Sequence, residues 1–327
     1  MKSAIVLFSG ICLTVAVMHA QQPPPAPGTA TPLPRPPARE PQWAFPVING
    51  QLPAEEPGPK SLAGSTKSYT PGQIDDLLNP PDWFPDEHPP APSIIQKGHA
   101  GALACGSCHL MSGEGHPESA GMTGFTADYI VRQMNDFKSG KRIDIARMNG
   151  ISKELSDEEI RQAADWFSKL KASSWTKVTE AAMVPKTFVG AGRMRFAQPA
   201  GGMEPIGARI ITLPQDQARA RLRDPHAGAG FIAYVPPGTI AKGKALVDRG
   251  GSGKTIQCTI CHGDDLKGIG NVPRLAGLHP IYIARQLHLF KDGSRNGGDA
   301  QLMKKPTAKL TDDDILNLAA YLGSLAP

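Results

Sequence analysis

The sequence predicts an all-α protein with two helical domains in tandem, a long irregular segment between them and a proline-rich arm before them. Three observations lead to this prediction. A five-residue cysteine motif occurs twice, at 105–109 and 258–262. The residues after each copy match at a constant offset of 153, and the matched stretches show helical periodicity. The chain as a whole has 32 prolines and 35 glycines, a composition that favours much irregular backbone.

The N-terminus, residues 1–20, is typical of a signal peptide. Met1-Lys2 precedes an apolar run over 4–17, which is too short to span a membrane comfortably, and cleavage is expected after Ala20. Cys12 lies in this run and would be removed with it. No later stretch is apolar enough to span a membrane, so we expect an exported protein with no membrane span in the mature chain.

Residues 21–92 are predicted to form an acidic, largely irregular arm. Residues 21–60 include 13 prolines, and residues 21–92 carry 4 basic and 8 acidic groups, a net charge of −4. Trp83 and Phe84 are expected to anchor the arm on a domain, because aromatic side chains usually bury; the alternative is a partner contact. Nothing in the chain resembles a nucleic-acid module.

The two predicted domains occupy 93–172 and 237–327. Each has a short helix before its cysteine motif, around 92–101 and 240–249. Each has an amphipathic helix after it, the first over 128–138 with Ile130, Met134 and Phe137 at helical spacing. The last helix of each domain begins at a capping box, at 156–159 and, in a weaker version, at 311–314.

The middle segment, 173–236, has little periodicity and is predicted to be irregular. Ile210-Ile211 is the one candidate strand, and 218–223 is a candidate helical turn. We expect its arginines, Arg219, Arg221 and Arg223, to form a solvated face; a docking patch for an acidic partner is the alternative.

The two cysteine motifs predict which cofactor the chain binds. Each reads Cys-x-x-Cys-His, the pattern at which c-type haem is attached: two thiols form thioethers with the haem vinyl groups, and the adjacent imidazole ligates the iron. Zinc sites and thiol redox centres also use Cys-x-x-Cys. Two copies with His, in an exported chain with no other mature cysteine, favour two covalently attached haem c groups. The anchoring residues are Cys105, Cys108, Cys258 and Cys261, with His109 and His262 as proximal iron ligands.

A second axial ligand on the iron distinguishes an electron carrier, in which both axial positions are filled, from an enzyme, in which one axial position is open to substrate. Met148 and Met303 occupy equivalent positions seven residues before Leu155 and Leu310, in what is predicted to be a loop ahead of the last helix. A thioether there would close the site to oxygen and raise the reduction potential.

Met122 and Met134 are assigned to packing, and Met194 and Met203 are disfavoured as axial ligands. His116, His226, His279 and His288 are expected to be surface or hydrogen-bonded histidines. For the ligating imidazoles, the carbonyl of Pro273 is a candidate acceptor. Its counterpart in the first repeat is Ala120, which leaves open a different orientation of the first haem.

The repeats resemble class I cytochromes c, and their tandem arrangement resembles the dihaem cytochrome c4 type. The resemblance is carried by the stretches 282–295 and 129–142, each followed by its methionine and by the start of the last helix. It covers about 93–172 and 238–327. It implies two all-α haem domains, His/Met ligation and periplasmic electron transfer. The acidic arm and the long middle segment depart from the pattern.

We therefore predict an exported, periplasmic dihaem cytochrome c with no catalytic residues. It would move single electrons between periplasmic or membrane-bound redox proteins, and it would be soluble or held at the membrane by a partner. Two alternatives stay open: a haem subunit of a periplasmic dehydrogenase or oxidase complex, and a dihaem peroxidase-like enzyme with one open haem.

Overall fold

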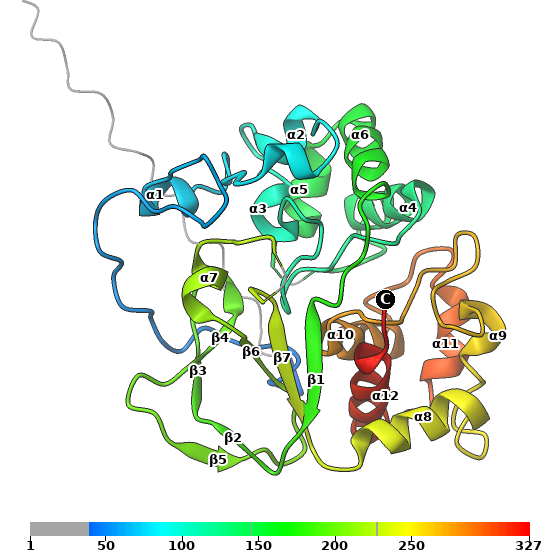
Figure 1. Ribbon diagram of the computed structural model, residues 1–327. Helices are drawn as coiled ribbons and strands as arrows, with labels where there is room; N and C mark the ends of the chain where they lie inside the picture. The colour runs from blue at the N-terminus through cyan, green and yellow to red at the C-terminus, as the bar shows by residue number, and fades with distance from the viewer. Residues whose placement is uncertain (1–38, 145, 227) are drawn as a thin grey trace, which may run out of the picture. The chain divides into compact units, whose positions relative to one another are not determined.

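The computed structural model describes residues 39–144, 146–226 and 228–327 (Figure 1). The predicted signal peptide, 1–20, and the first part of the arm, 21–38, lie outside these residues. Within the described ranges no helix is both long and apolar enough to cross a membrane. The described residues belong to one compact unit.

The first repeat is helical, as predicted. Its main helix α4 begins after Thr126, whose hydroxyl accepts from the backbone N–H of Tyr129, and α6 begins at the predicted capping box of Ser156 and Glu159. The apolar face of α6 buries Ile160, Ala163 and Phe167. In order, its helices are α2 Ser93–Gln96, α3 Gly106–His109, α4 Ala127–Lys138, α5 Met148–Glu154 and α6 Asp157–Phe167.

The second repeat follows the same plan. Its last helix, α12, starts at a full capping box, because the Thr311 hydroxyl accepts from the Asp314 N–H and the Asp314 carboxylate accepts from the Thr311 N–H. Helix α8 crosses α12 so closely that a Cβ on Gly243 would lie 2.0 Å from the carbonyl oxygen of Asn317. Its helices are α8 Thr239–Arg249, α9 Thr259–His262, α10 Pro280–Lys291, α11 Gln301–Thr307 and α12 Asp312–Ser324.

Repeat-equivalent polar residues meet at the seam between the two repeats. Arg142 and Arg295 pair through their backbones and are both 6% exposed. Arg142 donates to Gln133 in its own repeat and to Gln286 and the Tyr282 hydroxyl in the other. Arg295 makes the mirror set of bonds, to Gln286, Gln133 and the Tyr129 hydroxyl. The internal repeat of the sequence is therefore an approximate two-fold relation in the structure.

The prediction of an irregular middle segment was wrong. Strand β1 Thr176–Glu180 runs parallel to β7 Phe231–Val235, which pairs antiparallel with β6 Ile211–Pro214. Two smaller hairpin-like pairs are β2 Met183–Pro185 with β5 Met203–Pro205, and β3 Thr187–Val189 with β4 Arg195–Ala197. The remaining elements are the 3-10 turn η2 Ala191–Arg193 and α7 Gln217–Arg221.

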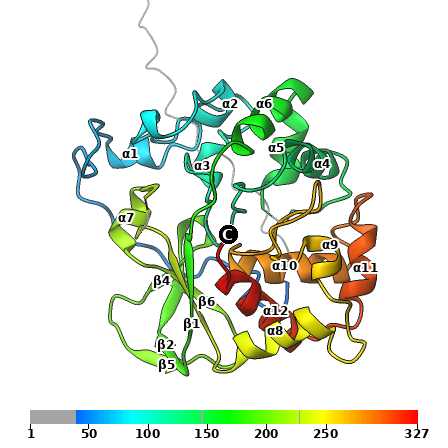
Figure 2. The same ribbon diagram turned by 45° about the vertical axis from the view of Figure 1, so that its right-hand side comes forward.

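This segment escapes prediction because its strands have only three to five residues and their partners are far apart in sequence. Thr176 pairs with Phe231, 55 positions later. In the structure the residues of β7 alternate between buried and partly exposed, as in a half-buried strand, but all five are apolar, so the sequence shows no period-2 pattern there. The predicted strand at Ile210-Ile211 is confirmed in part by β6, and the predicted helical turn by α7. Figures 1 and 2 place β1 beside α12.

The described part of the arm is mostly irregular, with only α1 Pro71–Ile74 and the 3-10 turn η1 Pro85–Glu87. It nevertheless contributes to the core: Trp43, Ala44 and Phe45 are buried in the cluster that runs through both repeats. Trp83 is 2% exposed and donates to the carbonyl oxygen of Leu222. Trp83 is therefore a buried anchor, but its hydrogen bond fastens the arm to the middle segment and not, as predicted, to one of the two helical domains.

Candidate cofactor-binding sites

Each cysteine motif folds into one helical turn, α3 in the first repeat and α9 in the second. His109 N–H donates to the Cys105 carbonyl at 3.0 Å, and His262 N–H donates to the Cys258 carbonyl at the same distance. Positive φ ends both turns, at Leu110 (61°) and Gly263 (85°). A single turn of this kind places the two sulfurs and the imidazole around one edge of a ligand.

Both motif histidines are held in the same way. His109 Nδ1 lies 2.8 Å from the carbonyl oxygen of Ala120, and His262 Nδ1 lies 2.8 Å from that of Pro273. Because a carbonyl only accepts, each Nδ1 carries the hydrogen and each Nε2 presents its lone pair. The predicted role of Pro273 is confirmed, and Ala120 fills it equally well since the bond uses the backbone. The first imidazole is therefore held as the second is.

Burial controls the protonation of both groups. It lowers the pKa of His109 and of His262, which keeps the imidazoles neutral, the form that binds a metal. Burial also raises the pKa of Cys105 to about 12 and that of Cys258 to about 11. Thiol redox centres need an easily formed thiolate, so these environments do not favour that alternative. The four cysteines of the described residues form no disulfide.

The structure places Met148 and Met303 equivalently but not in loops. Met148 begins α5 and Met303 lies in α11, and both side chains are half-buried. The helix around Met148 is set up by Asp144, whose carboxylate accepts from several N–H groups at the start of α5, including that of Met148 at 2.8 Å. Met303 packs against the main core cluster, as does Cys258. The loop prediction missed these short helices because seven residues give too little periodicity.

Three of the other methionines, Met111, Met122 and Met134, behave as packing residues. Met111 is 6% exposed, and its sulfur would lie 2.7 Å from a Cβ on Gly106 in the first motif. Met122 and Met134 are half-buried against the core. His279 is buried between Thr176 and the Glu114 carbonyl, at 2.7 and 3.1 Å, so it is a hydrogen-bonded histidine as expected.

Sequence reasoning missed Arg223. It was assigned to a solvated face, yet it is half-buried and donates to the carbonyl oxygen of Ser107 inside the first motif. Arg221 and Arg219 form ion pairs with Glu55 and Asp224. The only available signal was the run of three alternate arginines, which does not distinguish a surface face from one that covers a neighbour.

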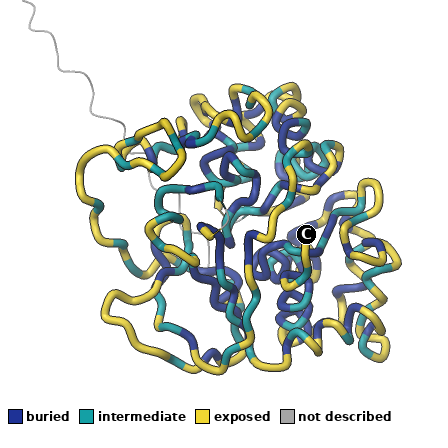
Figure 3. The backbone as a smooth tube through the Cα atoms, in the orientation of Figure 1, coloured by how far each residue is buried: buried dark blue, intermediate teal, exposed yellow. Residues whose placement is uncertain are grey.

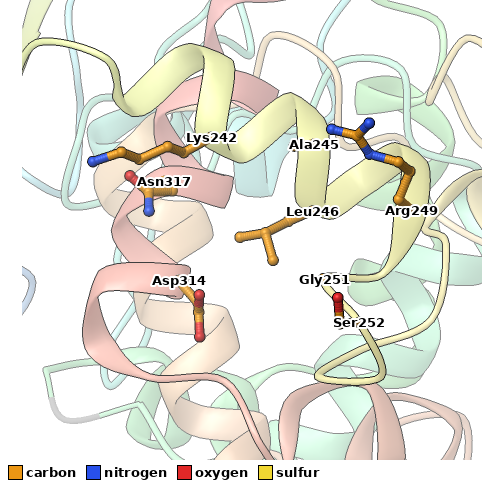
Figure 4. A pocket seen from close by; sticks show the side chains of 8 residues that line it. All are labelled: Lys242, Ala245, Leu246, Arg249, Gly251, Ser252, Asp314 and Asn317. Atoms are coloured by element: carbon orange, nitrogen blue, oxygen red, sulfur yellow. The ribbon is translucent and has the colours of Figure 1, made fainter.

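The donor groups fit haem c. Each repeat offers two thiols and a neutral imidazole on one turn, with a thioether on a neighbouring short helix. A hollow of about 560 Å³ between α8 and α12 is a different feature (Figure 4). Its lining includes Lys242, Arg249 and Asp314, and no motif cysteine, motif histidine or candidate methionine.

Comparison with known proteins relates both repeats to a single family. The family model described as Cytochrome c matches residues 240–326. Cytochrome c-554(548) of Halomonas halodenitrificans is 37% identical over 75 residues, which are 23% of this chain and 90% of that protein. Cytochrome c4 of Pseudomonas aeruginosa is 26% identical over 233 residues, covering 70% of this chain and 87% of the relative.

A third relative has a named physiological role. The thiosulfate dehydrogenase electron acceptor of Thiomonas intermedia is 28% identical over 229 residues, covering 68% of this chain and 79% of its own length. Among solved structures, reduced recombinant cytochrome c4 from Pseudomonas stutzeri aligns with 68% of this chain and 93% of that chain, at 24% identity and a TM-score of 0.43.

Proposed function

Because this chain belongs to the cytochrome c family and is cytochrome c4-like, we propose that it is an exported electron carrier with two covalently attached haem c groups. Family membership makes it a c-type cytochrome, a carrier of electrons with covalently bound haem and with redox proteins as partners. The number of haems, their ligands and the periplasmic location are the proposal. The signal-like residues 1–20 and the periplasmic setting of haem attachment in bacteria support the location.

The proposed attachment residues are Cys105 and Cys108 in the first repeat and Cys258 and Cys261 in the second. His109 and His262 are the proximal ligands, and Met148 and Met303 the distal ones. The observation that carries this assignment is the matched Nδ1–carbonyl bond of 2.8 Å in both motifs. It fixes the tautomer and the ring plane of each imidazole, as expected for a metal ligand.

In electron transfer the protein would bind the haem groups, orient their ligands and shield the iron from solvent. Haem c supplies the one-electron iron chemistry when bound. The carbonyls of Ala120 and Pro273 hold the imidazoles so that little reorganisation is needed when the charge changes. The buried seam of Arg142 and Arg295 holds the two repeats in one arrangement. A thioether opposite each imidazole would close the iron to oxygen and peroxide.

Haem stoichiometry tests the proposal. The mature protein should carry two haems per chain that survive acid–acetone extraction. The double variant Cys258→Ser/Cys261→Ser should carry one. Bound zinc in place of haem, or haem that is extracted from the wild type, would contradict the assignment.

A second candidate function is that of a haem-bearing electron acceptor attached to a dehydrogenase. The similarity to the Thiomonas intermedia protein favours it. Purification from native membranes and periplasm separates the two: a stoichiometric dehydrogenase partner supports the subunit, and a free dihaem protein supports the carrier. The peroxidase-like alternative needs an exchangeable distal site, and the matched pair Met148 and Met303 argues against it.

A further inference from the structure

One carboxylate of the first repeat is buried without a cation bound to it. Glu114 is 5% exposed. Its Oε1 accepts from the backbone N–H of Ser173 at 2.6 Å, and its Oε2 accepts from the Thr123 hydroxyl at 3.4 Å. Within the described ranges it forms no ion pair, whereas Glu118 of the same loop pairs with Arg285. Buried carboxylates are usually paired as Glu118 is, so the burial of Glu114 needs an explanation.

The second repeat has no equivalent of this group. At the offset of 153, Glu114 corresponds to Lys267, which is exposed, and Thr123 corresponds to Ala276, whose side chain makes no hydrogen bond. The second repeat therefore folds in the same way without the carboxylate and without its hydroxyl partner. The fold does not require them, unlike the symmetric arginine seam between the repeats.

Arg274 of the second repeat is the cation that faces Glu114, and it acts through Thr123. The Arg274 Nη2 donates to the Thr123 hydroxyl at 3.2 Å, and its Nε donates to the Thr123 carbonyl at 2.8 Å. The other facing groups are neutral. Ser173 contributes its backbone N–H, and His279 donates from Nε2 to the Glu114 carbonyl at 3.1 Å. Burial lowers the pKa of His279 to about 3, so this imidazole carries no charge.

Burial makes the Glu114 carboxylate easier to protonate than an exposed one. It raises the pKa of Glu114, and the bonds from Ser173 and Thr123 and the charge of Arg274 offset only part of this effect. His116, in the same loop, is neutral because burial lowers its pKa well below the ordinary value. Glu114 is therefore a buried group whose protonation responds to a change of charge nearby.

Such a change of charge is expected at the first cofactor site. Glu114 follows His109 by five residues, and the Gly115 N–H donates to the His109 carbonyl at 3.0 Å, which folds this stretch back on itself. The Phe167 ring centroid lies 5.9 Å from that of the His109 imidazole, and a Cβ on Gly113 would lie 3.5 Å from the same ring. Figure 3 shows buried backbone in the middle of the molecule, between the repeats. Charges separated by protein interact more strongly than charges separated by water.

We propose that Glu114 couples proton uptake to electron uptake in the first repeat. One electron enters from the redox partner, and one proton enters from solvent and binds the Glu114 carboxylate; both leave together on reoxidation, so the net charge of the site is conserved. Ser173, whose N–H bonds the carboxylate, is exposed and gives the proton a short way in. The inference rests on the proposed function, because it needs a redox centre in the first repeat.

The pH dependence of the two reduction potentials tests this coupling. In redox titrations of the dihaem protein from about pH 5 to 8, one potential should fall as the pH rises, since an ionised Glu114 stabilises the oxidised state. The slope should reach up to about 59 mV per pH unit, which is a tenfold change in proton concentration converted for one electron. In Glu114→Gln this slope should be lost, and the potential should equal the wild-type value at low pH. The other potential should not change.

Glu158→Gln is the matched control, because it removes an exposed carboxylate from α6 of the same repeat. Its two potentials should follow pH as those of the wild type do. The proposal would be overturned by a slope that persists in fully loaded Glu114→Gln, or by an equal loss of slope in Glu158→Gln. Covalent haem is counted in every sample. A wild type without it contradicts the proposed function, whereas a loaded wild type with two pH-independent potentials contradicts only the coupling.

Two further measurements do not need Glu114→Gln to fold. The reduced-minus-oxidised infrared spectrum of the wild type should gain the C=O band of a protonated carboxyl, and its absence after full reduction would overturn the proposal. Thr123→Val should move the sloping range to higher pH, because the bond from the hydroxyl lowers the pKa of Glu114. A merely structural role of the cluster would not shift this range, so an unshifted range in a loaded variant also contradicts the proposal.

Discussion

Replacing Arg142 with Met should lower the free energy of unfolding by weakening the contact between the two repeats, while leaving each haem motif intact. Arg142 donates to Gln133 at 2.8 Å, to Gln286 at 2.9 Å and to the Tyr282 hydroxyl at 3.3 Å. Its guanidinium lies 4.4 Å from the centroid of the Phe137 ring. Methionine retains much of the apolar stem but makes none of these bonds.

The magnitude follows from the bonds that cross the seam. A hydrogen bond from a charged donor contributes about 1.5–3 kcal/mol. The Tyr282 hydroxyl would lose the bond from Arg142, whereas Gln133 and Gln286 would keep their bonds from Arg295. Two crossing bonds, one of them long, give about 3–4 kcal/mol. Removing Arg142 also relieves the repulsion of Arg295, which faces it and helps to lower the Arg142 pKa. We expect a net loss of about 3 kcal/mol in the free energy of unfolding.

Urea unfolding, followed by haem absorbance and tryptophan fluorescence, measures this loss. Arg295→Met should cost a similar amount because its bonds are the mirror set. Arg161→Met is the matched control: its guanidinium is half-exposed and pairs with Asp128 at the surface, so it should cost under about 1 kcal/mol. A loss at Arg142 no larger than that at Arg161 would refute the view that the seam holds the repeats together.

Three further predictions concern other parts of the molecule. Burial lowers the pKa of His279 to about 3. As the pH falls below about 6.5, the unfolded chain therefore binds a proton at His279 and the folded protein does not. The free energy of unfolding should then fall by about 1.4 kcal/mol per pH unit between pH 6.5 and pH 3. In urea titrations at pH 6.5 and 5, His279→Asn should flatten this slope, and an unchanged slope would contradict the assignment. Trp43→Ala should lower the free energy of unfolding by about 3 kcal/mol, because the Trp43 side chain is only 7% exposed. Ile48→Ala, at an exposed position, should lower it by under about 0.5 kcal/mol. Equal losses would show that the arm is not part of the core. Met148→Ala and Met303→Ala should each open one haem and lower its potential in a redox titration, whereas Met122→Ala should not; a shift with Met122→Ala alone would move the distal ligand to that residue.

Much of the helical framework was predictable because it is encoded locally. The capping boxes at Ser156 and Thr311 and the spacing of Ile130, Met134 and Phe137 define helix starts and buried faces from a few neighbouring residues. The haem motifs are local in the same sense, since one turn carries all three groups. The prediction of a tandem cytochrome c arrangement is confirmed by the relatives.

The rest depends on contacts between distant residues. The sheet joins Thr176 to Phe231, and the first motif is bonded through Ser107 to both Leu77 and Arg223. Neither leaves a periodic trace in the sequence. Gln133 and Arg142 recur 153 residues later as Gln286 and Arg295, but a repeated polar residue does not by itself indicate that it is buried. The surroundings of the motifs therefore had to come from the structure.

The spin state of the oxidised protein tests the central claim most directly. If Met148 and Met303 both ligate, electron paramagnetic resonance should show two low-spin irons, and the near-infrared spectrum should show the Met-to-iron(III) charge-transfer band. Cyanide should then bind only slowly, because a thioether must first leave. One high-spin haem that binds cyanide or peroxide rapidly would contradict the closed carrier and favour the peroxidase-like alternative.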